Sequence, residues 1–273
     1  MARGVSAFVA RAIIAVGAAS VVVPLLWTLL SGFKNRVDIV TPTPMLFFHP
    51  TLENFLYVAE RESVRTGLLN SIIVSGCSVL IGAALGLPCA YAVARYPMRF
   101  AHDIQFFVLS LRFLPPVAIA IPLIVIWLDV GLYDTRVALV VTYSLLTLAT
   151  TIWLAIPAFK RVPAEIEEAA FVDGYGPYAI FFLIALPVAW KSLIGAVVFS
   201  FVLVWNEFLI ALMLTTSDAK TLPVVASEMT QLGRDVPWGI LNASVILLSL
   251  PPLLFLGVLS RFLSSALKTR NQG

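Results

Sequence analysis

The chain has 273 residues, of which 60% are hydrophobic and only 12% are charged, and its mean hydropathy is +0.97. Water-soluble globular domains do not reach this composition, so the chain is expected to lie in a bilayer. Its formal net charge of +3 gives no reason to expect nucleic acid as a partner, because the Lys and Arg residues are spread over many short segments.

Six apolar runs are long enough to cross the bilayer, which takes roughly 20 residues of helix. They cover about residues 12–32, 68–94, 104–128, 137–158, 193–214 and 240–262. The first run is too long for the core of a signal peptide and has no convincing cleavage site, so we expect it to be retained. The sequence therefore predicts an all-α polytopic membrane protein with six transmembrane helices in one domain, residues 1–273.

Six crossings place both ends of the chain on the same side of the membrane. Lys and Arg are more numerous in the segments on that side than on the other, which is typical of the cytoplasmic side. We therefore expect both termini and the loop 159–191 to be cytoplasmic, and the loop 33–66 to be external.

The external loop 33–66 begins with proline-rich backbone. Thr41-Pro42-Thr43-Pro44 and His49-Pro50 favour extended or turning conformations. Thr51 is a suitable N-cap for a short helix after them. We expect this loop to cover the outer mouth of the protein.

No metal site is expected from the usual soft ligands. The histidines and cysteines of the chain are His49, His102, Cys77 and Cys89. The histidines lie in loops on opposite predicted sides, and the cysteines share one apolar run about three helical turns apart. The cysteines therefore indicate apolar packing positions and not a disulfide.

Small residues are frequent in the second predicted span, which lets helix backbones approach closely. Gly82 and Gly86 form a G-x-x-x-G pattern. Two interpretations stay open: packing against another helix of the same chain, which is the commoner use in such a bundle, or a dimer contact.

Prolines interrupt the third predicted span. Pro115, Pro116 and Pro122 remove backbone donors and are expected to bend or break the helix. Irregular backbone at membrane depth must lie against protein or a wet cavity, so Pro115 and Pro116 are candidate walls of a translocation path. Arg112 either extends to the membrane interface or faces that path.

The loop 159–191 is amphipathic and polar. Pro163 suits a helix start, three glutamates favour the positive helix end, and Gly174 suits a left-handed stop, so we predict a helix of roughly two to three turns. Ile166, Ala169, Ala170 and Asp173 would form one narrow face, with Glu165 and Glu168 beside it. Such a face fits a groove on another protein better than a membrane surface, because it lacks large apolar residues and a basic flank. We expect a second short helix at 178–184.

The fifth predicted span carries Asn206 and Glu207, which should face protein or water because lipid exposure is costly. Glu207 would then either contact a translocated solute or tie helices together as a buried structural acid. Both interpretations stay open.

Several strings resemble one family of transporters. Glu168-Ala169-Ala170, with Gly174 and Ile184-Ala185-Leu186-Pro187 at fixed spacings, resembles the cytoplasmic coupling loop of permease subunits in binding-protein-dependent ABC importers. Other strings resemble the carbohydrate branch, in particular the shorter six-span member of the permease pair in maltose-type systems, over about residues 11–263. These strings are Asn70-Ser71, Tyr91-Ala92-Val93-Ala94-Arg95, Ile121-Pro122-Leu123, Trp205-Asn206-Glu207-Phe208 and Thr221-Leu222-Pro223-Val224.

The resemblance implies a type I ABC importer permease fold in the bacterial cytoplasmic membrane. It implies that five residues lie in a cleft of an ATPase subunit: Glu168, Ala169, Ala170, Asp173 and Gly174. The implied partners are a second six-span permease, two ATPase subunits or domains, and an external solute-binding protein. The chain has no G-x-x-x-x-G-K-[ST] motif, so ATP and Mg are expected on the partner ATPase, with no catalytic residue or cofactor in this chain.

Two other function classes are weaker. A secondary transporter would favour more intramembrane carboxylates and an inverted repeat, and an intramembrane enzyme would need converging catalytic side chains. Neither pattern is evident in the sequence.

Overall fold

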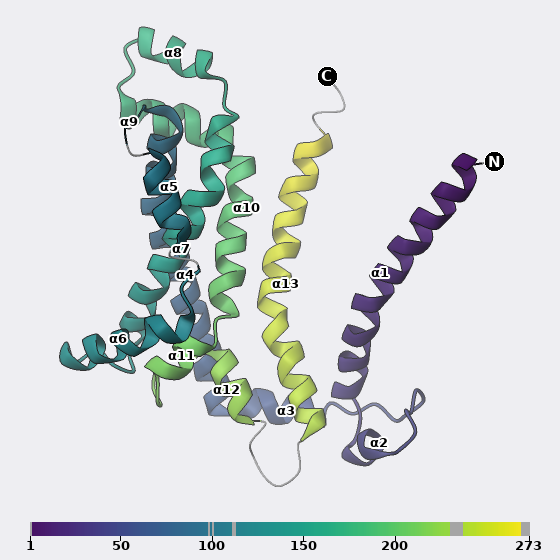
Figure 1. The fold of residues 1–273 in the computed structure, drawn as a ribbon. Coiled ribbons are helices and arrows are strands. Elements are labelled where there is room, and N and C mark those ends of the chain that lie inside the picture. The colour runs from purple at the N-terminus through teal and green to yellow at the C-terminus, as the bar shows by residue number, and fades with distance from the viewer. Residues whose placement is uncertain (1, 98, 100, 111–112, 230–236, 269–273) are drawn as a thin grey trace. The chain divides into compact units, whose positions relative to one another are not determined.

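The computed structural model describes residues 2–97, 99, 101–110, 113–229 and 237–268. Over these residues the structure is helical and holds no strand, as predicted (Figure 1). The contacts divide the chain into one unit of Met1–Arg65 and Val225–Leu250, and a second of Thr66–Val224 and Pro251–Gly273. The helices are α1 (Ala2–Gly32), α2 (Arg36–Val40), α3 (Glu53–Glu60), α4 (Glu62–Arg95), α5 (Ala101–Ser110), α6 (Pro116–Asp129), α7 (Arg136–Lys160), α8 (Ala164–Val172), α9 (Pro177–Ile180), η1 (Phe181–Ala185, a π-helix), α10 (Leu186–Trp205), α11 (Leu209–Leu214), α12 (Leu222–Met229) and α13 (Trp238–Lys268).

Among the described residues, 5 helical segments are long and apolar enough to cross a membrane. They are Val9–Gly32, Glu62–Arg95, Arg136–Lys160, Pro177–Trp205 and Trp238–Gly257. The predicted runs 12–32, 68–94, 137–158 and 240–262 lie within α1, α4, α7 and α13. The long apolar runs were therefore sufficient to locate these four helices.

The apolar run 104–128, expected as one transmembrane helix bent or broken by its prolines, is divided between two helices. The chain forms α5 and then, after an interruption, α6. Pro115 is extended (φ −59°, ψ 132°) and caps α6, with Pro116 in its first turn. A residue before proline avoids the helical region, whereas a proline suits the first helical position, so the pair starts a new helix. The expected break at these prolines is confirmed, but Pro122 stays inside α6.

The predicted fifth span of 193–214 is wrong at both ends. The membrane-length helix runs from Pro177 to Trp205 and stops before Glu207. It includes the region expected as a separate short helix, so the loop predicted as 159–191 is shorter and ends at Gly176. The π-helical turn η1 precedes Pro187, which has no N–H to donate to the carbonyl of the preceding turn.

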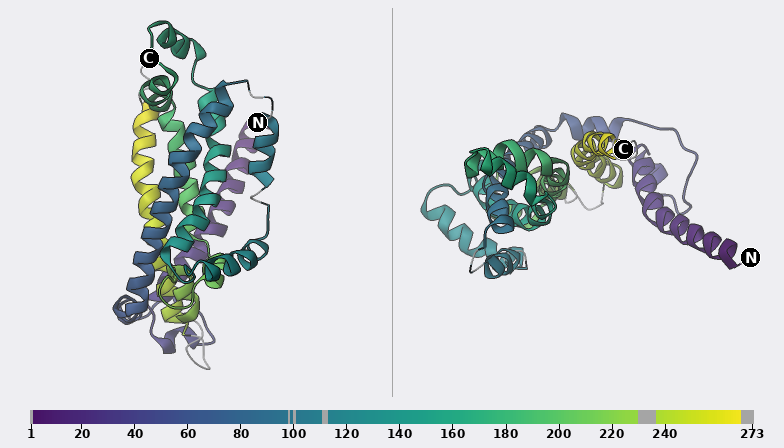
Figure 2. Two further views of the ribbon diagram at one scale, coloured as in Figure 1. Left: turned by 90° about the vertical axis from the view of Figure 1, so that its left-hand side faces the viewer. Right: turned by 90° about the horizontal axis from the view of Figure 1, so that it is seen from above.

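In the unit built on Thr66–Val224, α7 and α10 lie side by side, with α5 also against α7 (Figures 1 and 2). The helix α4 contacts α7 as well, since the Thr147 hydroxyl donates to the carbonyl of Ser78 at 2.7 Å. A Cβ at Gly82 would lie 2.7 Å from the Cβ of Thr147, and one at Gly86 would lie 3.1 Å from that of Thr151. The G-x-x-x-G pattern of α4 therefore packs against α7 of the same chain, which decides between its two interpretations.

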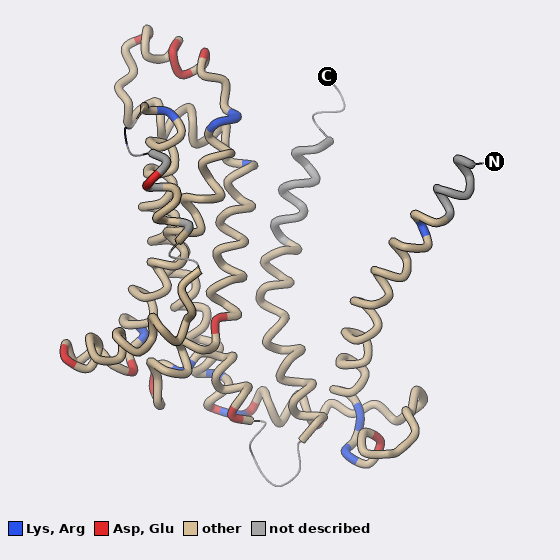
Figure 3. The backbone as a smooth tube through the Cα atoms, viewed as in Figure 1, with Lys and Arg blue, Asp and Glu red and all other residues tan. Residues whose placement is uncertain are grey.

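The two ends of this unit differ in what they carry. The helix α8 lies beyond the end of α7 that carries Lys160, whereas α6 and α11 lie at the end that carries Arg136 (Figure 1). Acidic and basic residues gather mainly at these ends, and the helices between them are almost free of charge (Figure 3).

The unit built on Met1–Arg65 holds the loop 33–66, which contains α2 and α3. The amide of Asn54, in α3, donates to the carbonyls of Gly32 and Lys34 at 2.9 Å each. The rings of Phe33 and Phe55 lie 4.7 Å apart. The short helix expected after Thr51 is present as α3, but its N-cap residue is Leu52 and not Thr51. The Thr51 hydroxyl accepts from the N–H of Glu53 at 3.1 Å. These contacts fasten the loop to the end of α1.

Candidate functional site

The helix α8 has well-defined ends. Pro163 is extended and precedes its first residue. At the other end Gly174 is left-handed (φ +89°), the N–H of Tyr175 donates to Ala170 O at 3.0 Å, and that of Gly174 donates to Phe171 O at 3.1 Å. This pair of hydrogen bonds is the Schellman arrangement, which satisfies carbonyls left free at a helix end. The helix start and stop predicted from sequence are both confirmed.

The inner side of α8 is formed by Glu167 and Ala170, which are the buried residues of this helix. Both oxygens of the Glu167 carboxylate are engaged by α4. Tyr91 Oη donates to Oε2 at 2.8 Å, and Arg95 Nε and Nη2 lie 2.9 and 2.7 Å from Oε1. Arg95 Nη2 also donates to the carbonyl of Val162.

Sequence reasoning did not single out Glu167 as a site residue. The available signal was the pair Tyr91 and Arg95, one helical turn apart in a string already noted, because residues four apart lie on one helix face. Which of the adjacent acids Glu167 and Glu168 would face that pair depends on how the connection after α7 folds.

The outer side of α8 differs from the predicted face. Ile166, Ala169 and Asp173 are exposed as expected, but Ala170 is only 6% exposed and faces the protein. The exposed surface instead includes Phe171 (69%) and Val172 (85%). Glu165 and Glu168 are exposed, as predicted. The free side of α8 thus combines two carboxylates with large apolar side chains, so the expectation that this face lacks large apolar residues is wrong.

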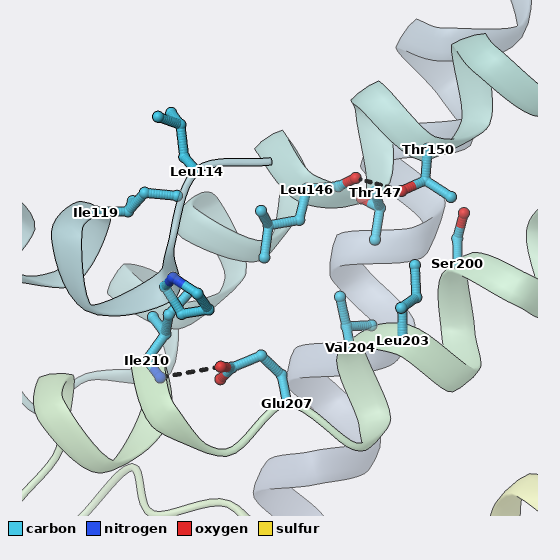
Figure 4. A pocket seen from close by; sticks show the side chains of 11 residues that line it. Leu114, Ile119, Leu146, Thr147, Thr150, Ser200, Leu203, Val204, Glu207 and Ile210 are labelled. Atoms are coloured by element: carbon cyan, nitrogen blue, oxygen red, sulfur yellow. Dashed lines mark hydrogen bonds between the residues drawn. The ribbon is translucent and has the colours of Figure 1, made fainter. Parts of the chain in front are cut away.

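A cavity of about 220 Å³ lies between α6, α7, α10 and α11 (Figure 4). Its polar lining comes from Glu207 and from hydroxyls of α7 and α10. These hydroxyls belong to Thr147, Thr150 and Ser200, and the remaining lining is apolar. The cavity therefore offers a few hydrogen-bonding groups among aliphatic walls.

The carboxylate of Glu207 is already bonded within the protein. Tyr143 Oη donates to it from α7, and the N–H groups of Ile210 and Ala211 donate to it at 3.0 and 3.1 Å. Those N–H groups belong to the first turn of α11, which has no earlier turn to bond to. Glu207 caps α11 and ties it to α7, so the structural interpretation has direct support, while its position at the cavity wall keeps a solute contact open.

The predicted translocation-path residues are not all brought together. Glu207 and Pro116 line the cavity. Asn206 is the C-cap residue of α10; it is exposed, and its side-chain amide donates to the carbonyl of Val202 at 2.8 Å. Pro115 caps α6, and Arg112 lies outside the described residues. Their role in a translocation path stays a prediction.

The far end of the unit holds a second network that sequence reasoning missed. The amide of Asn70 donates to the carbonyls of Asp218 and Lys220 at 2.9 Å each, and the hydroxyl of Ser71 accepts from the N–H of Leu222 at 2.8 Å. The two short strings at 70–71 and 221–224 are therefore contact partners. The carboxylate of Asp134 accepts five more hydrogen bonds from residues 216–219.

Comparison with known proteins places these features in a family. The model of the family described as "Binding-protein-dependent transport system inner membrane component" matches residues 82–269. The chain is 32% identical to a probable ABC transporter permease protein, y4oR, of Sinorhizobium fredii, over 89% of this chain and 87% of that protein. It is 30% identical to the diacetylchitobiose uptake system permease protein NgcG of Streptomyces coelicolor, over 93% and 85%.

Among solved structures, the fold is similar to a chain from a bacterial ABC transporter involved in the import of the acidic polysaccharide alginate. The TM-score is 0.78 at 18% identity, over 94% of this chain and 96% of that chain. The two chains therefore share a fold over most of their length. The chain belongs to the family of binding-protein-dependent transport system inner membrane components.

Proposed function

We propose that this chain forms half of the translocation path of an ATP-driven importer for a sugar or sugar-like solute. Family membership supports the importer assignment. A sugar cargo is supported by the relatives, one of which is a diacetylchitobiose permease, and by the alginate importer of similar fold. Selectivity among sugars is expected to lie mostly with the external solute-binding protein.

The observation that carries the coupling role is α8. It is a capped helix beyond the Lys160 end of α7, with its free side made of Glu165, Glu168 and the exposed Phe171 and Val172. We infer that this side enters a cleft of an ATPase subunit, where Glu168 meets a basic group and the apolar side chains fill a pocket. Ala169, Asp173 and Gly174 complete the surface, and Ala170 contributes by packing inward.

The other subunits of the proposed complex follow from the coupling role of α8. The chain has no phosphate-binding loop, so hydrolysis of ATP with Mg takes place on a separate chain and this subunit is not itself an enzyme. The complex contains a second permease as a heterodimer partner, two ATPase subunits or domains, and an external binding protein. Both termini and α8 are cytoplasmic, in accord with the excess of Lys and Arg in those segments.

The docking claim is tested by Glu168→Lys in the full complex. Reversing an exposed charge at a complementary interface is costly, so we expect the ATPase no longer to copurify and ATP-driven uptake to fall by about two orders of magnitude. Membrane insertion should be unchanged, because the side chain is exposed and makes no contact that holds α8.

The matched control is Asp103→Asn, which removes an exposed carboxylate in α5 and should keep ATPase copurification within about twofold. Normal ATPase copurification with Glu168→Lys would refute docking through this face of α8.

A further inference from the structure

We propose that Glu167 is a positioning residue that latches α8 to α4, so that a displacement of α8 is passed to this membrane helix. The inference rests on the proposed coupling role of α8. Glu167 lies on the side of α8 that faces away from the docking surface, and its bonds to Tyr91 and Arg95 connect α8 to α4.

The latch is a partly buried ion pair with a second, independent hydrogen bond. The side chains of Arg95 and Glu167 are 16% and 11% exposed, and their closest N–O distance is 2.7 Å. Tyr91 is 6% exposed and holds the other carboxylate oxygen at 2.8 Å. Charge-assisted bonds of this kind, partly removed from water, are stronger and less screened than surface pairs.

The latch lies where the ends of three helical segments meet, namely α4, α7 and η1. The ring of Tyr91 lies 5.4 Å from that of Phe159 at the end of α7 and 5.1 Å from that of Phe181 in the first turn of η1. Glu167 therefore bonds to the residue at the centre of an aromatic cluster, where α4 and α7 end and the membrane-length helix Pro177–Trp205 begins. A pull on α8 acts on this cluster through the carboxylate.

The chain itself connects α8 only to α7 and α9, and not to α4. Short connections lead from α7 into α8 through residues 161–163 and from α8 to α9 through residues 173–176. The link between α8 and α4 is made by side chains that are 72 residues apart in sequence. If the Glu167 carboxylate is removed, α8 remains attached to α7 and η1 but loses these bonds to α4.

The fold of α8 does not depend on the latch. Its start at Pro163 and its Schellman end at Gly174 are local, and the exposed docking side chains make no use of Glu167. Removing the carboxylate should therefore leave α8 folded and able to bind the ATPase while weakening the transfer of motion. A residue that only stabilised the loop would impair docking as well.

The test uses the full complex reconstituted in vesicles with its ATPases and binding protein. We compare ATPase copurification, ATPase activity stimulated by the solute-loaded binding protein, and solute taken up per ATP hydrolysed. For Glu167→Ala we expect copurification within about twofold of the wild type, with uptake per ATP reduced roughly fivefold or more. Asp103→Asn is again the control for a lost carboxylate on this end of the protein.

Tyr91→Phe provides a milder variant if Glu167→Ala lowers the yield of folded protein. It removes one hydrogen bond to Glu167 and keeps the ring that packs on Phe159 and Phe181. We expect normal copurification and a fall in uptake per ATP of about threefold.

Wild-type coupling ratios in both variants, or a loss of ATPase copurification equal to the loss of uptake, would overturn the latch. Those results leave the docking role intact, because that role is tested separately by Glu168→Lys.

Discussion

The carboxylate of Asp134 fixes the loop between α11 and α12. It accepts from the Thr216 and Ser217 hydroxyls and from the N–H groups of Ser217, Asp218 and Ala219. Burial alone would raise the pKa of Asp134, but the hydrogen bonds from these residues favour the charged form and hold the pKa well below its usual range. The loop is therefore organised around an ionised acid.

This pKa shift predicts how the loop responds to pH. A carboxyl whose pKa is lowered in the folded state stabilises that state above its unfolded pKa, and this stabilisation is lost as the pH falls through the folded pKa. We expect amide protection at 216–219 to stay constant from neutrality to about pH 4 and to decline only below it. The check is hydrogen exchange corrected for the intrinsic rate, and a decline between pH 7 and pH 5 would argue against the assignment.

The variant Asp134→Asn removes the negative charge of the side chain and keeps the backbone conformation of this position. Asp134 has a φ of +58°, which Asn tolerates better than most residues. We expect the variant to lower the local stability of the loop by about 1–3 kcal/mol, seen as faster exchange at 216–219, because one oxygen acceptor becomes a donor. Asp129→Asn, an exposed acid at the end of α6, should leave this exchange unchanged.

Single residues of the site were only partly predictable. The sequence indicated Glu168 through its spacing to Gly174, but Glu167 and Glu168 are adjacent and point about 100° apart on a helix. Which of them faces inward is decided by the turn at Arg161 to Pro163, a tertiary feature. Glu207 was identified as an unusual intramembrane acid, but its capping role requires knowing that the helix stops at Trp205.

The contact between α4 and α7 gives a prediction with a built-in control. A Cβ at Gly82 would lie 2.7 Å from Thr147 Cβ and 2.9 Å from its backbone carbonyl carbon, whereas a Cβ at Gly76 would meet no atom within 4 Å. We expect Gly82→Ala to lower the free energy of unfolding by about 1–3 kcal/mol. Gly76→Ala in the same helix should be neutral or slightly stabilising, because alanine favours helix.

Detergent-solubilised protein unfolded by heat or denaturant provides the measurement, with helix content as the signal. Equal stabilities for Gly82→Ala and Gly76→Ala would show that α4 and α7 are not in contact through this pair of glycines.

Whole helices were predictable from sequence where a long apolar run or a local start and stop signal marked them. Long apolar runs identified α1, α4, α7 and α13, and the local signals at Pro163 and Gly174 identified α8. The two runs that do not correspond to single helices, 104–128 and 193–214, differ in how visible the break was. Pro115 and Pro116 indicated the break in the first run, whereas the end of α10 before Asn206 gave no signal, because a hydropathy average does not register a break between apolar residues.

The unit built on Thr66–Val224 separates two tasks at its two ends. One end carries α8 and its latch to α4, and the other carries the loop that Asp134, Asn70 and Ser71 hold in place. The helices α7 and α10 run between them and line the cavity beside Glu207. This arrangement fits a subunit that binds an ATPase on one side of the membrane and receives its solute on the other side.

The central claim is that ATP hydrolysis on a partner chain drives uptake through this subunit. The most direct measurement is solute uptake into vesicles that hold the full complex, with ATP inside and the loaded binding protein outside. We predict uptake that requires both and that continues when ionophores collapse the ion gradients. Uptake that follows an imposed ion gradient in the absence of ATP would contradict the account.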